Sequence, residues 1–319
     1  MDNCINKLYF GDCLAVCNNL LNTSVNGNID LIYIDPPFGF KRDECFGMIP
    51  WKQNTQPKNR VDEILPEIEK LQDIGVANYL RWLYPRLVIM RELLSDKGSI
   101  YVHLDWHVGH YVKLLMDEIF GKDKFVNEIV WCYTQGGRPV LGFPNKHDIL
   151  LFYSKTEDFL LNKEAIKIPY DLYSAKSSSA FTKTDSDGRK FYTKQVNGKT
   201  YTYYQDEGKN PYDWWNDIPK ITGRAAVSEN TELTGYDTQK PEKLLERIIK
   251  ASSNEDSIVA DFFAGSGTTG AVAEKLGRRW IMSDISSKSI ETIKCRMNLE
   301  EKDIINVKET FILCTAVKR

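Results

Sequence analysis

Residues 257–286 read SIVADFFAGSGTTGAVAEKLGRRWIMSDIS, and this stretch decides the fold. An apolar run leads into Gly265, Gly267 and Gly270, and a helical pattern and a second apolar run follow. Glycines at this spacing let the backbone turn sharply and approach a ligand without a Cβ in the way. The stretch therefore predicts a strand–loop–helix–strand unit that binds the nucleoside part of a cofactor.

Two acids frame this glycine loop and bear on the kind of cofactor. Asp284 ends the second apolar run, where a carboxylate can accept hydrogen bonds from a ribose diol. Asp261 stands four residues before the first glycine, where it can receive an ammonium group and would repel a pyrophosphate. The spacing alone admits a dinucleotide or a sulfonium cofactor, and Asp261 favours S-adenosylmethionine. The candidate cofactor residues here are Asp261, Phe262, Phe263, Ala264, Gly265, Ser266, Gly267, Thr268, Thr269, Asp284 and Ile285.

A second motif, DLIYIDPPFGF, occupies residues 30–40. Its apolar residues predict a strand buried on both faces, as in parallel sheets. Asp35 follows this strand, and then Pro36 and Pro37 fix two φ angles and remove two amide donors. The turn is therefore stiff and its carbonyl groups are free to accept hydrogen bonds. Taken alone, these residues fit a strand-ending cap as well as a catalytic carboxylate.

Short apolar runs alternate with helical patterns along the rest of the chain. The predicted strands are Lys7–Phe10, Asp30–Ile34, Ser99–Leu104, Asn127–Tyr133, Asp148–Tyr153, Ser257–Phe262 and Arg279–Met282. The predicted helices are Tyr79–Leu94, with Pro85 as a kink or a late start, His107–Phe120, Pro241–Ala251, Thr268–Leu276 and Ser287–Leu299. This alternation is typical of an α/β protein with a Rossmann-like, doubly wound and mostly parallel sheet. The consecutive runs between residues 99 and 153 predict an antiparallel hairpin that closes one edge.

Composition narrows the class of protein. With 319 residues and 42% hydrophobic residues the chain can build a sizeable core, and its net charge of −2 excludes a globally basic surface. The seven cysteines form no C-x-x-C pair, which indicates neither a zinc ribbon nor a disulfide framework. The N-terminus lacks a signal-peptide pattern and no stretch has the length of a membrane span. We therefore expect a cytoplasmic protein with reduced thiols and no membrane partner.

Residues 155–235 are polar and break the alternation. Within 176–205 six basic residues stand against two aspartates, for a charge of +4, with aromatic residues interleaved. That pattern predicts contacts with nucleic-acid phosphates, although a solvated loop would show it too. The candidate DNA-binding residues are Lys183, Arg189, Lys190 and Lys194, with weaker candidates Lys41, Arg42, Arg138 and Lys146 beside the expected cleft.

Two further patterns each admit two interpretations. His103, His107 and His110 have a spacing that can ligate a metal, but they divide between a predicted strand and a predicted helix. We expect them to be structural and the protein to use no metal. Trp214 and Trp215 can stack on bases, yet paired tryptophans are more often packing residues, one buried and one half exposed.

Together, DPPF and DFFAGSGTTG resemble the two central motifs of the amino-group DNA methyltransferases. Because DPPF comes first and the glycine loop last, the order resembles the permuted β class of that family. The resemblance implies a catalytic domain made of residues 1–154 and 236–319, with a target-recognition module at 155–235 between them. It implies S-adenosylmethionine as cofactor, S-adenosylhomocysteine as product and double-stranded DNA as substrate. A cognate restriction endonuclease and a homodimer are further expectations from the resemblance.

The resemblance also assigns roles to single residues. Asp35 and the carbonyl of Pro36 would accept hydrogen bonds from the exocyclic amine of a flipped base, on which Phe38 would stack. An acid at the first position of the tetrapeptide favours N6 of adenine over N4 of cytosine. The segment NKLYFGDC would place Asp12 and Cys13 near the cofactor's adenine. The segment TGYDTQKPEKLLERII would place Gln239, Lys240 and Pro241 near its methionine end.

Three other functions remain open at this point. A cytosine-N4 or RNA amino-methyltransferase would use the same two motifs. An NAD-type dehydrogenase is allowed by the glycine loop but leaves Asp35 and Asp261 without a role. A catalytically silent DNA-binding protein is the alternative that is not an enzyme.

Overall fold

The protein is described here from a computed structural model, which covers residues 5–37, 66, 74–134, 141–172, 179–221 and 232–307. Its main sheet contains β1 (Lys7–Phe10), β2 (Ile29–Ile34), β3 (Leu94–Leu104), β4 (Phe125–Cys132), β5 (His147–Ser154), β9 (Trp214–Trp215), β10 (Ile258–Asp261), β11 (Arg279–Asp284) and β12 (Ile304–Asn306). The helices are α1 (Cys13–Leu20), α3 (Ile74–Leu93), α4 (Gly109–Phe120), α6 (Glu242–Ser252), α7 (Thr268–Lys275) and α8 (Ser287–Met297). Short 3-10 turns are η1 (Lys122–Lys124), η2 (Glu164–Ile166) and η3 (Glu301–Asp303).

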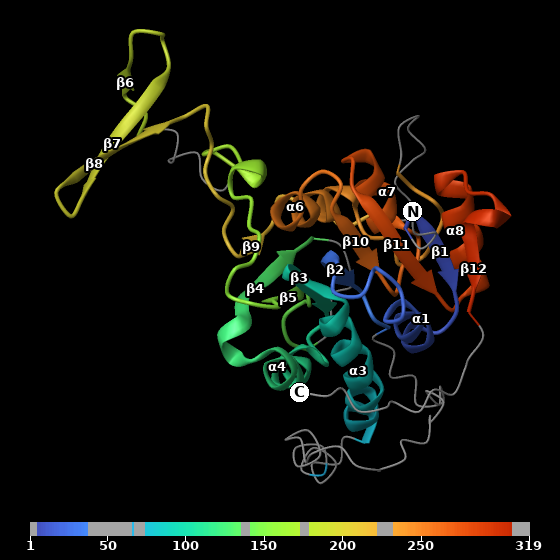
Figure 1. Cartoon of the computed structure of the whole chain (residues 1–319). Helices are drawn as coiled ribbons and strands as arrows, with labels where there is room; N and C mark the ends of the chain where they lie inside the picture. Colours follow the sequence, from blue (N-terminus) through green and yellow to red (C-terminus); the bar gives the residue numbers. More distant parts are fainter. Residues whose placement is uncertain are drawn as a thin grey trace.

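The main sheet is mostly parallel and draws strands from both ends of the chain. Its order is β12-β1-β11-β10-β2-β3-β5-β4-β9. All pairs from β12 to β3 are parallel, whereas β5 runs antiparallel to both β3 and β4. The predicted α/β fold is therefore confirmed, as is the antiparallel closure of one edge. Strands β10 and β11, from the second half of the chain, lie between β1 and β2 (Figure 1).

Helices cover both faces of this sheet and give three layers (Figure 1). Strand β2 has apolar side chains on both faces, because successive side chains of a strand point to opposite sides. Ile32 and Ile34 point into the core beneath α1, α3 and α4. Leu31 and Tyr33 point into the core beneath α6, α7 and α8. All four side chains are buried, as predicted for a strand covered on both faces. The same alternation directs Asp35 toward the α6 layer.

Residues within 155–235 belong to two sheets. β6 (Lys183–Thr184), β7 (Lys190–Val196) and β8 (Lys199–Tyr204) form a separate antiparallel sheet that projects from the body (Figure 1). The short strand β9 instead pairs with β4 at the edge of the main sheet. There Trp215 is buried and Trp214 is 39% exposed, so the packing interpretation of the tryptophan pair is confirmed.

Several elements differ from those predicted. Helix α1 and the strands β9 and β12 carry no apolar run long enough to predict them. Helix α1 is capped by Asp12 and buries one face, whereas β9 and β12 take their hydrogen-bonding partners from β4 and β1. Helix α3 begins at Ile74, five residues earlier than predicted, with Pro85 inside it rather than at its start. Within the described ranges, no helix combines the length and apolar character that crossing a bilayer requires.

Candidate active site

Acidic residues mark the carboxyl ends of four neighbouring parallel strands. Asp12 lies just beyond β1, Asp284 ends β11, Asp261 ends β10 and Asp35 follows β2. Because these strands are adjacent and parallel, all four acids lie side by side at the carboxyl-terminal ends of the strands. Ligands of open α/β sheets bind at this edge, so the arrangement defines the candidate active site.

The carboxylate of Asp35 has a partner for only one of its two oxygens among the described residues. The ammonium of Lys240, which precedes α6, pairs with Asp35 Oδ2. Asp35 Oδ1 is buried and has no hydrogen-bond partner among the residues that the structure describes. An unpaired buried carboxylate oxygen is costly, and it is therefore a candidate acceptor for a donor that arrives with a ligand.

The proline turn holds this carboxylate at the strand end. Pro36 is buried and Pro37 is exposed, so the turn is anchored on one side and open on the other. Neither residue can donate a backbone hydrogen bond, which leaves their carbonyls as the polar groups of the turn. Phe38, expected to stack on a base, lies outside the described residues.

Each glycine of the loop has its own steric requirement. Gly265 and Gly267 have φ angles of +51° and +74°, which residues with a Cβ rarely adopt. At Gly270, a Cβ would overlap the Met282 side chain, so this glycine lets α7 pack closely on β11. The loop therefore has the backbone shape of the predicted nucleoside-binding unit.

Asp261 shapes the glycine loop from inside. Its Oδ1 accepts the backbone N–H of Phe263 at 3.0 Å, and its Oδ2 accepts the hydroxyl of Thr269. The side chain is only 3% exposed, and burial raises the pKa of Asp261 to about 7 despite these two donors. Its carboxyl group is therefore only partly ionised at neutral pH, which weakens the charge argument against a pyrophosphate.

Asp284 and Ile285 present a surface beside the loop. Asp284 Oδ2 accepts the N–H of Gly265 and Oδ1 accepts the N–H of Ser286, both at 2.8 Å. Ile285 follows with 65% of its side chain exposed, although large apolar side chains normally avoid water. An acid next to an exposed apolar side chain matches the two halves of an adenosine, the ribose diol and the flat base.

Other predicted cofactor residues have partners within the protein. Asp12 caps α1 through Leu14 and forms an ion pair with the buried Arg86 at 2.7 Å. Cys13 begins α1 as a buried free thiol. The Gln239 side-chain amide bonds to Thr234 and to the carbonyl of Glu232, so it orders the turn before α6. Pro241 is the N-cap residue of that helix.

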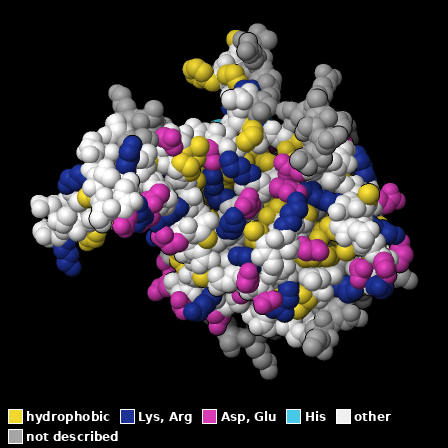
Figure 2. Space-filling model, turned by 90° about the horizontal axis from the view of Figure 1, so that it is seen from above, with side chains coloured by type: hydrophobic (Ala, Val, Ile, Leu, Met, Phe, Trp, Pro, Cys, Tyr) yellow, Lys and Arg dark blue, Asp and Glu magenta, His cyan; other side chains and the backbone are white. Residues whose placement is uncertain are grey.

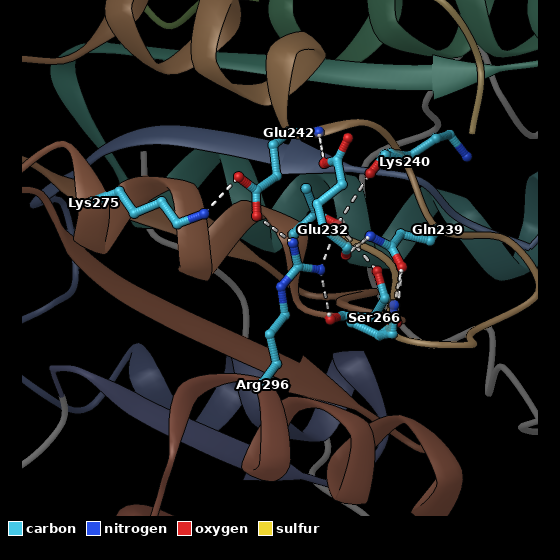
Figure 3. A network of polar contacts seen from close by, with 9 residues as sticks. Glu232, Gln239, Lys240, Glu242, Ser266, Lys275 and Arg296 are labelled. Atoms are coloured by element: carbon cyan, nitrogen blue, oxygen red, sulfur yellow. Dashed lines mark hydrogen bonds and ion pairs between the residues drawn. The ribbon is translucent and has the colours of Figure 1, made fainter. Parts of the chain in front are cut away.

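A polar network joins α6 to the glycine loop, and the sequence pattern did not predict it (Figure 3). Arg296 on α8 donates to the carbonyl of Ser266 and pairs with Glu242 at 2.7 Å. Glu242 also pairs with Lys275, while its own N–H donates to the Glu232 carboxylate. These residues are far apart in sequence, so no local spacing signals that they meet.

A second polar chain lies in the protein interior near Asp35. Tyr33 Oη lies 2.8 Å from His103 Nδ1, and His103 Nε2 lies 3.3 Å from Asp148. Burial lowers the pKa of His103, and Lys240 adds to this effect. His107 instead bonds to Asp105. No group of three or more His, Cys, Asp or Glu side chains in the described ranges is arranged to hold a metal ion.

The predicted DNA-binding residues lie in different parts of the fold. Lys146 lies just before β5, and Lys183, Lys190 and Lys194 lie in the projecting sheet. Arg189 pairs with Asp206 at 2.7 Å and with Glu207 at 3.1 Å, two acids just beyond the segment whose charge predicted phosphate contacts. Its charge is thus already paired within the protein. Lys41, Arg42 and Arg138 lie outside the described residues.

A family model described as DNA methylase, for N6 and N4 methyltransferases, matches residues 29–295. The match includes both the proline turn and the glycine loop, and the chain belongs to this family. The permuted order of its strands agrees with the resemblance drawn from the two motifs.

Individual relatives narrow the comparison. The chain is 28% identical to the DNA adenine methyltransferase YhdJ of Escherichia coli, over 97% of this chain and 86% of that protein. It is also 28% identical to the Type II methyltransferase M.EcaI of Enterobacter cloacae, over 83% of this chain but only 64% of the relative's length. Among solved structures, the cytosine-N4-specific PvuII DNA methyltransferase has a TM-score of 0.59 at 17% identity, over 92% of this chain and 86% of that one. That likeness shows the shared fold.

Proposed function

We propose that this protein is an S-adenosylmethionine-dependent DNA methyltransferase that methylates N6 of adenine in duplex DNA. The observation that carries the proposal is Asp35, which follows β2 and has one buried oxygen with no partner among the described residues. Family membership supports the class of reaction. The adenine target is supported by the acid at the first position of DPPF and by the similarity to YhdJ.

The residues at the sheet edge fit the cofactor. Asp284 would hold the ribose diol, Ile285 would cover the adenine and the glycine loop would pass beneath the sugar. Asp261 would face the ammonium at the methionine end of the cofactor, and Lys240, which pairs with Asp35 in this structure, would face its carboxylate. When bound, S-adenosylmethionine supplies an electrophilic methyl group on its sulfonium.

The protein's own contribution is to position the amine. Asp35 Oδ1 and the Pro36 carbonyl would accept the two hydrogens of the exocyclic amine, which turns the nitrogen lone pair out of conjugation with the ring. The nitrogen would gain the methyl group as the bond from that group to the sulfonium breaks, which leaves S-adenosylhomocysteine. The nitrogen would also lose one proton, and Asp35 is the nearby carboxylate that can accept it. The stiff proline turn reduces the motion of both acceptors, so the main catalytic effect is orientation.

The proposal extends to where the protein acts and to how the base reaches the site. The protein would act on double-stranded DNA in the cytoplasm. The target base would enter at the exposed side of the proline turn. A cognate restriction endonuclease, a homodimer and the division at residues 154 and 235 stay predictions from the resemblance.

Methyl transfer to unmethylated genomic DNA, read by nucleoside mass spectrometry, tests the proposal. We expect N6-methyladenine from the wild type and a rate lower by about 10²–10³-fold for Asp35→Ala, because the amine loses its charged acceptor. Asp158→Ala is the matched control, because Asp158 is an exposed acid beyond the end of β5 and pairs with Lys97 rather than with a residue of the site. N4-methylcytosine would overturn the adenine assignment. No methylated nucleoside, despite measurable cofactor binding, would make the silent DNA-binding protein the better interpretation.

A further inference from the structure

The hairpin formed by β7 and β8 ends in an exposed ribbon. Asn197 and Gly198 have φ angles of +50° and +76°, as a two-residue hairpin turn requires. Every residue from Lys194 to Thr202 is exposed. Figure 2 shows this arm extending from the body, with lysine and arginine side chains on its outer part and acidic side chains nearer the body.

The two faces of the ribbon carry different side chains. Cross-strand pairs place Lys194 opposite Tyr201 and Val196 opposite Lys199. Because side chains alternate along a strand, one face holds Lys190, Tyr192, Lys194, Val196, Lys199, Tyr201 and Tyr203. This face contains three lysines and no acid, and we call it the lysine face.

The inner part of the lysine face is anchored and its outer part is free to contact a partner. Tyr192 stacks on Tyr203 with ring centroids 5.0 Å apart, and Phe181 packs against Tyr192. Phe181 is itself buried, so these rings hold the base of the ribbon. Farther out, Val196 and Tyr201 are 40% and 46% exposed, although both are large apolar or aromatic side chains.

The opposite face of the ribbon carries mostly uncharged polar side chains. Thr193, Gln195, Thr200 and Thr202 occupy it, and Lys183 donates to the Thr193 hydroxyl at 2.9 Å. Arg189 stacks over Tyr204 and is paired with its two acids. Of the lysines in the projecting sheet that have no acidic partner, three therefore lie on the lysine face, and Lys183 lies on the other.

We propose that the outer ribbon enters the major groove of duplex DNA with its lysine face. Lys190, Lys194 and Lys199 would contact phosphates, whereas Val196 and Tyr201 would reach base edges. A two-stranded ribbon fits the width of the major groove, and the lysines match the charge of the groove walls. This inference rests on the proposed function, because it assigns DNA recognition to one face of one hairpin in the same enzyme.

Salt dependence of DNA binding tests the phosphate contacts. The probe is a fluorescent 40-base-pair random-sequence duplex titrated with the full chain at several NaCl concentrations. For Lys194→Gln/Lys199→Gln we expect the slope of log Kd against log[NaCl] to fall by about 2, with about 10- to 100-fold weaker binding at 0.1 M salt. Lys97→Gln/Lys302→Gln removes two exposed lysines outside the projecting sheet, in β3 and η3, and should leave the slope unchanged. Equal slopes for the two double variants would overturn the inference.

Protection from dimethyl sulfate tests the groove. This reagent attacks guanine N7, which lies in the major groove. On a duplex containing the methylation site mapped with the wild type, we expect Tyr201→Ala to lose protection of N7 positions and Thr202→Ala, on the opposite face, to keep it. Protection that persists in Tyr201→Ala would contradict the base contact.

The salt titration also separates this inference from the proposed function. If the wild type binds DNA with the expected slopes but methylates nothing, the ribbon interface stands and the enzyme assignment fails. If the wild type methylates DNA and the ribbon variants bind as it does, only the ribbon inference fails.

Discussion

Asp35 and Asp261 end neighbouring strands, yet the fold gives their carboxyl groups different surroundings. Among the residues that the structure describes, one oxygen of Asp35 has no partner, whereas both oxygens of Asp261 accept donors from their own loop. An open oxygen suits a group that must receive a substrate. A fully bonded carboxyl group stabilises the loop, and its effect on a ligand depends on its ionisation.

Asp261 leads to a prediction about the pH dependence of cofactor binding. Burial raises the pKa of Asp261 to about 7, so the fraction of ionised carboxyl rises as pH increases from 6 to 7.5. If Asp261 faces the ammonium of the cofactor, affinity for S-adenosylhomocysteine should rise about fivefold or more over this interval. Calorimetric titration measures it. Asp261→Asn should remove the rise, and any remaining change belongs to the ligand's own amino group. A pH-independent affinity in the wild type would leave Asp261 with a loop-capping role only.

At the level of secondary-structure elements, the glycine loop packs closely against helix α8. A Cβ on Gly267 would lie 2.8 Å from Ile293 Cγ1, whereas Gly27, with a similar φ of +72°, has nothing within 4 Å of its Cβ position. Both positions therefore have the same backbone requirement, and only one has a packing requirement.

The two glycines allow that packing requirement to be measured. We expect Gly27→Ala to lower the free energy of unfolding by about 1 kcal/mol, through its left-handed backbone alone. Gly267→Ala should cost about 1–3 kcal/mol more, because Ile293 must also move. Urea denaturation of the two variants gives the difference. Equal losses would show that α8 adjusts freely around the loop.

At the scale of the whole molecule, a buried ion pair ties residues of the 155–235 segment to the main core. Asp217 and Arg247 are 4% and 7% exposed, and the guanidinium of Arg247 donates two hydrogen bonds to the carboxylate. The pair lies beside the short β9–β4 pairing, and Arg247 also lies over the Trp215 ring. The base of the segment is thereby attached to α6.

Breaking this pair should be costly. Asp217→Ala leaves the Arg247 charge buried, so we expect the free energy of unfolding to fall by about 3–5 kcal/mol. Asp217→Leu/Arg247→Met, which removes both charges, should recover much of the loss. The exposed pair of Lys97 with Asp158 supplies the control, since Asp158→Ala should cost less than about 1 kcal/mol. Similar losses for Asp217→Ala and Asp158→Ala would contradict a structural role for the buried pair.

Long apolar runs made the central strands predictable from the sequence, whereas short or polar elements could not be predicted. Strands β2 and β5 have buried runs and match the prediction to within one residue at each end. Strand β3 begins at Leu94, five residues before its predicted start, and β4 pairs antiparallel with β5 as predicted. Strands β9 and β12 have two and three residues, and such short strands depend on the neighbour with which they pair. The contact of Lys240 with Asp35 spans 205 positions, so no local pattern contains it.

The glycine loop, the proline turn and the class of fold follow from the sequence alone, because each depends on local spacing and on backbone geometry that few residues allow. The strand order of the folded chain is needed to show that Asp12, Asp284, Asp261 and Asp35 lie at the carboxyl ends of adjacent strands. The folded structure also shows that the lysines of one hairpin gather on one face while Arg189 is paired elsewhere. The physical reason is that strand order and cross-strand register come from burying surfaces distant in the chain, whereas a motif records only its immediate neighbours.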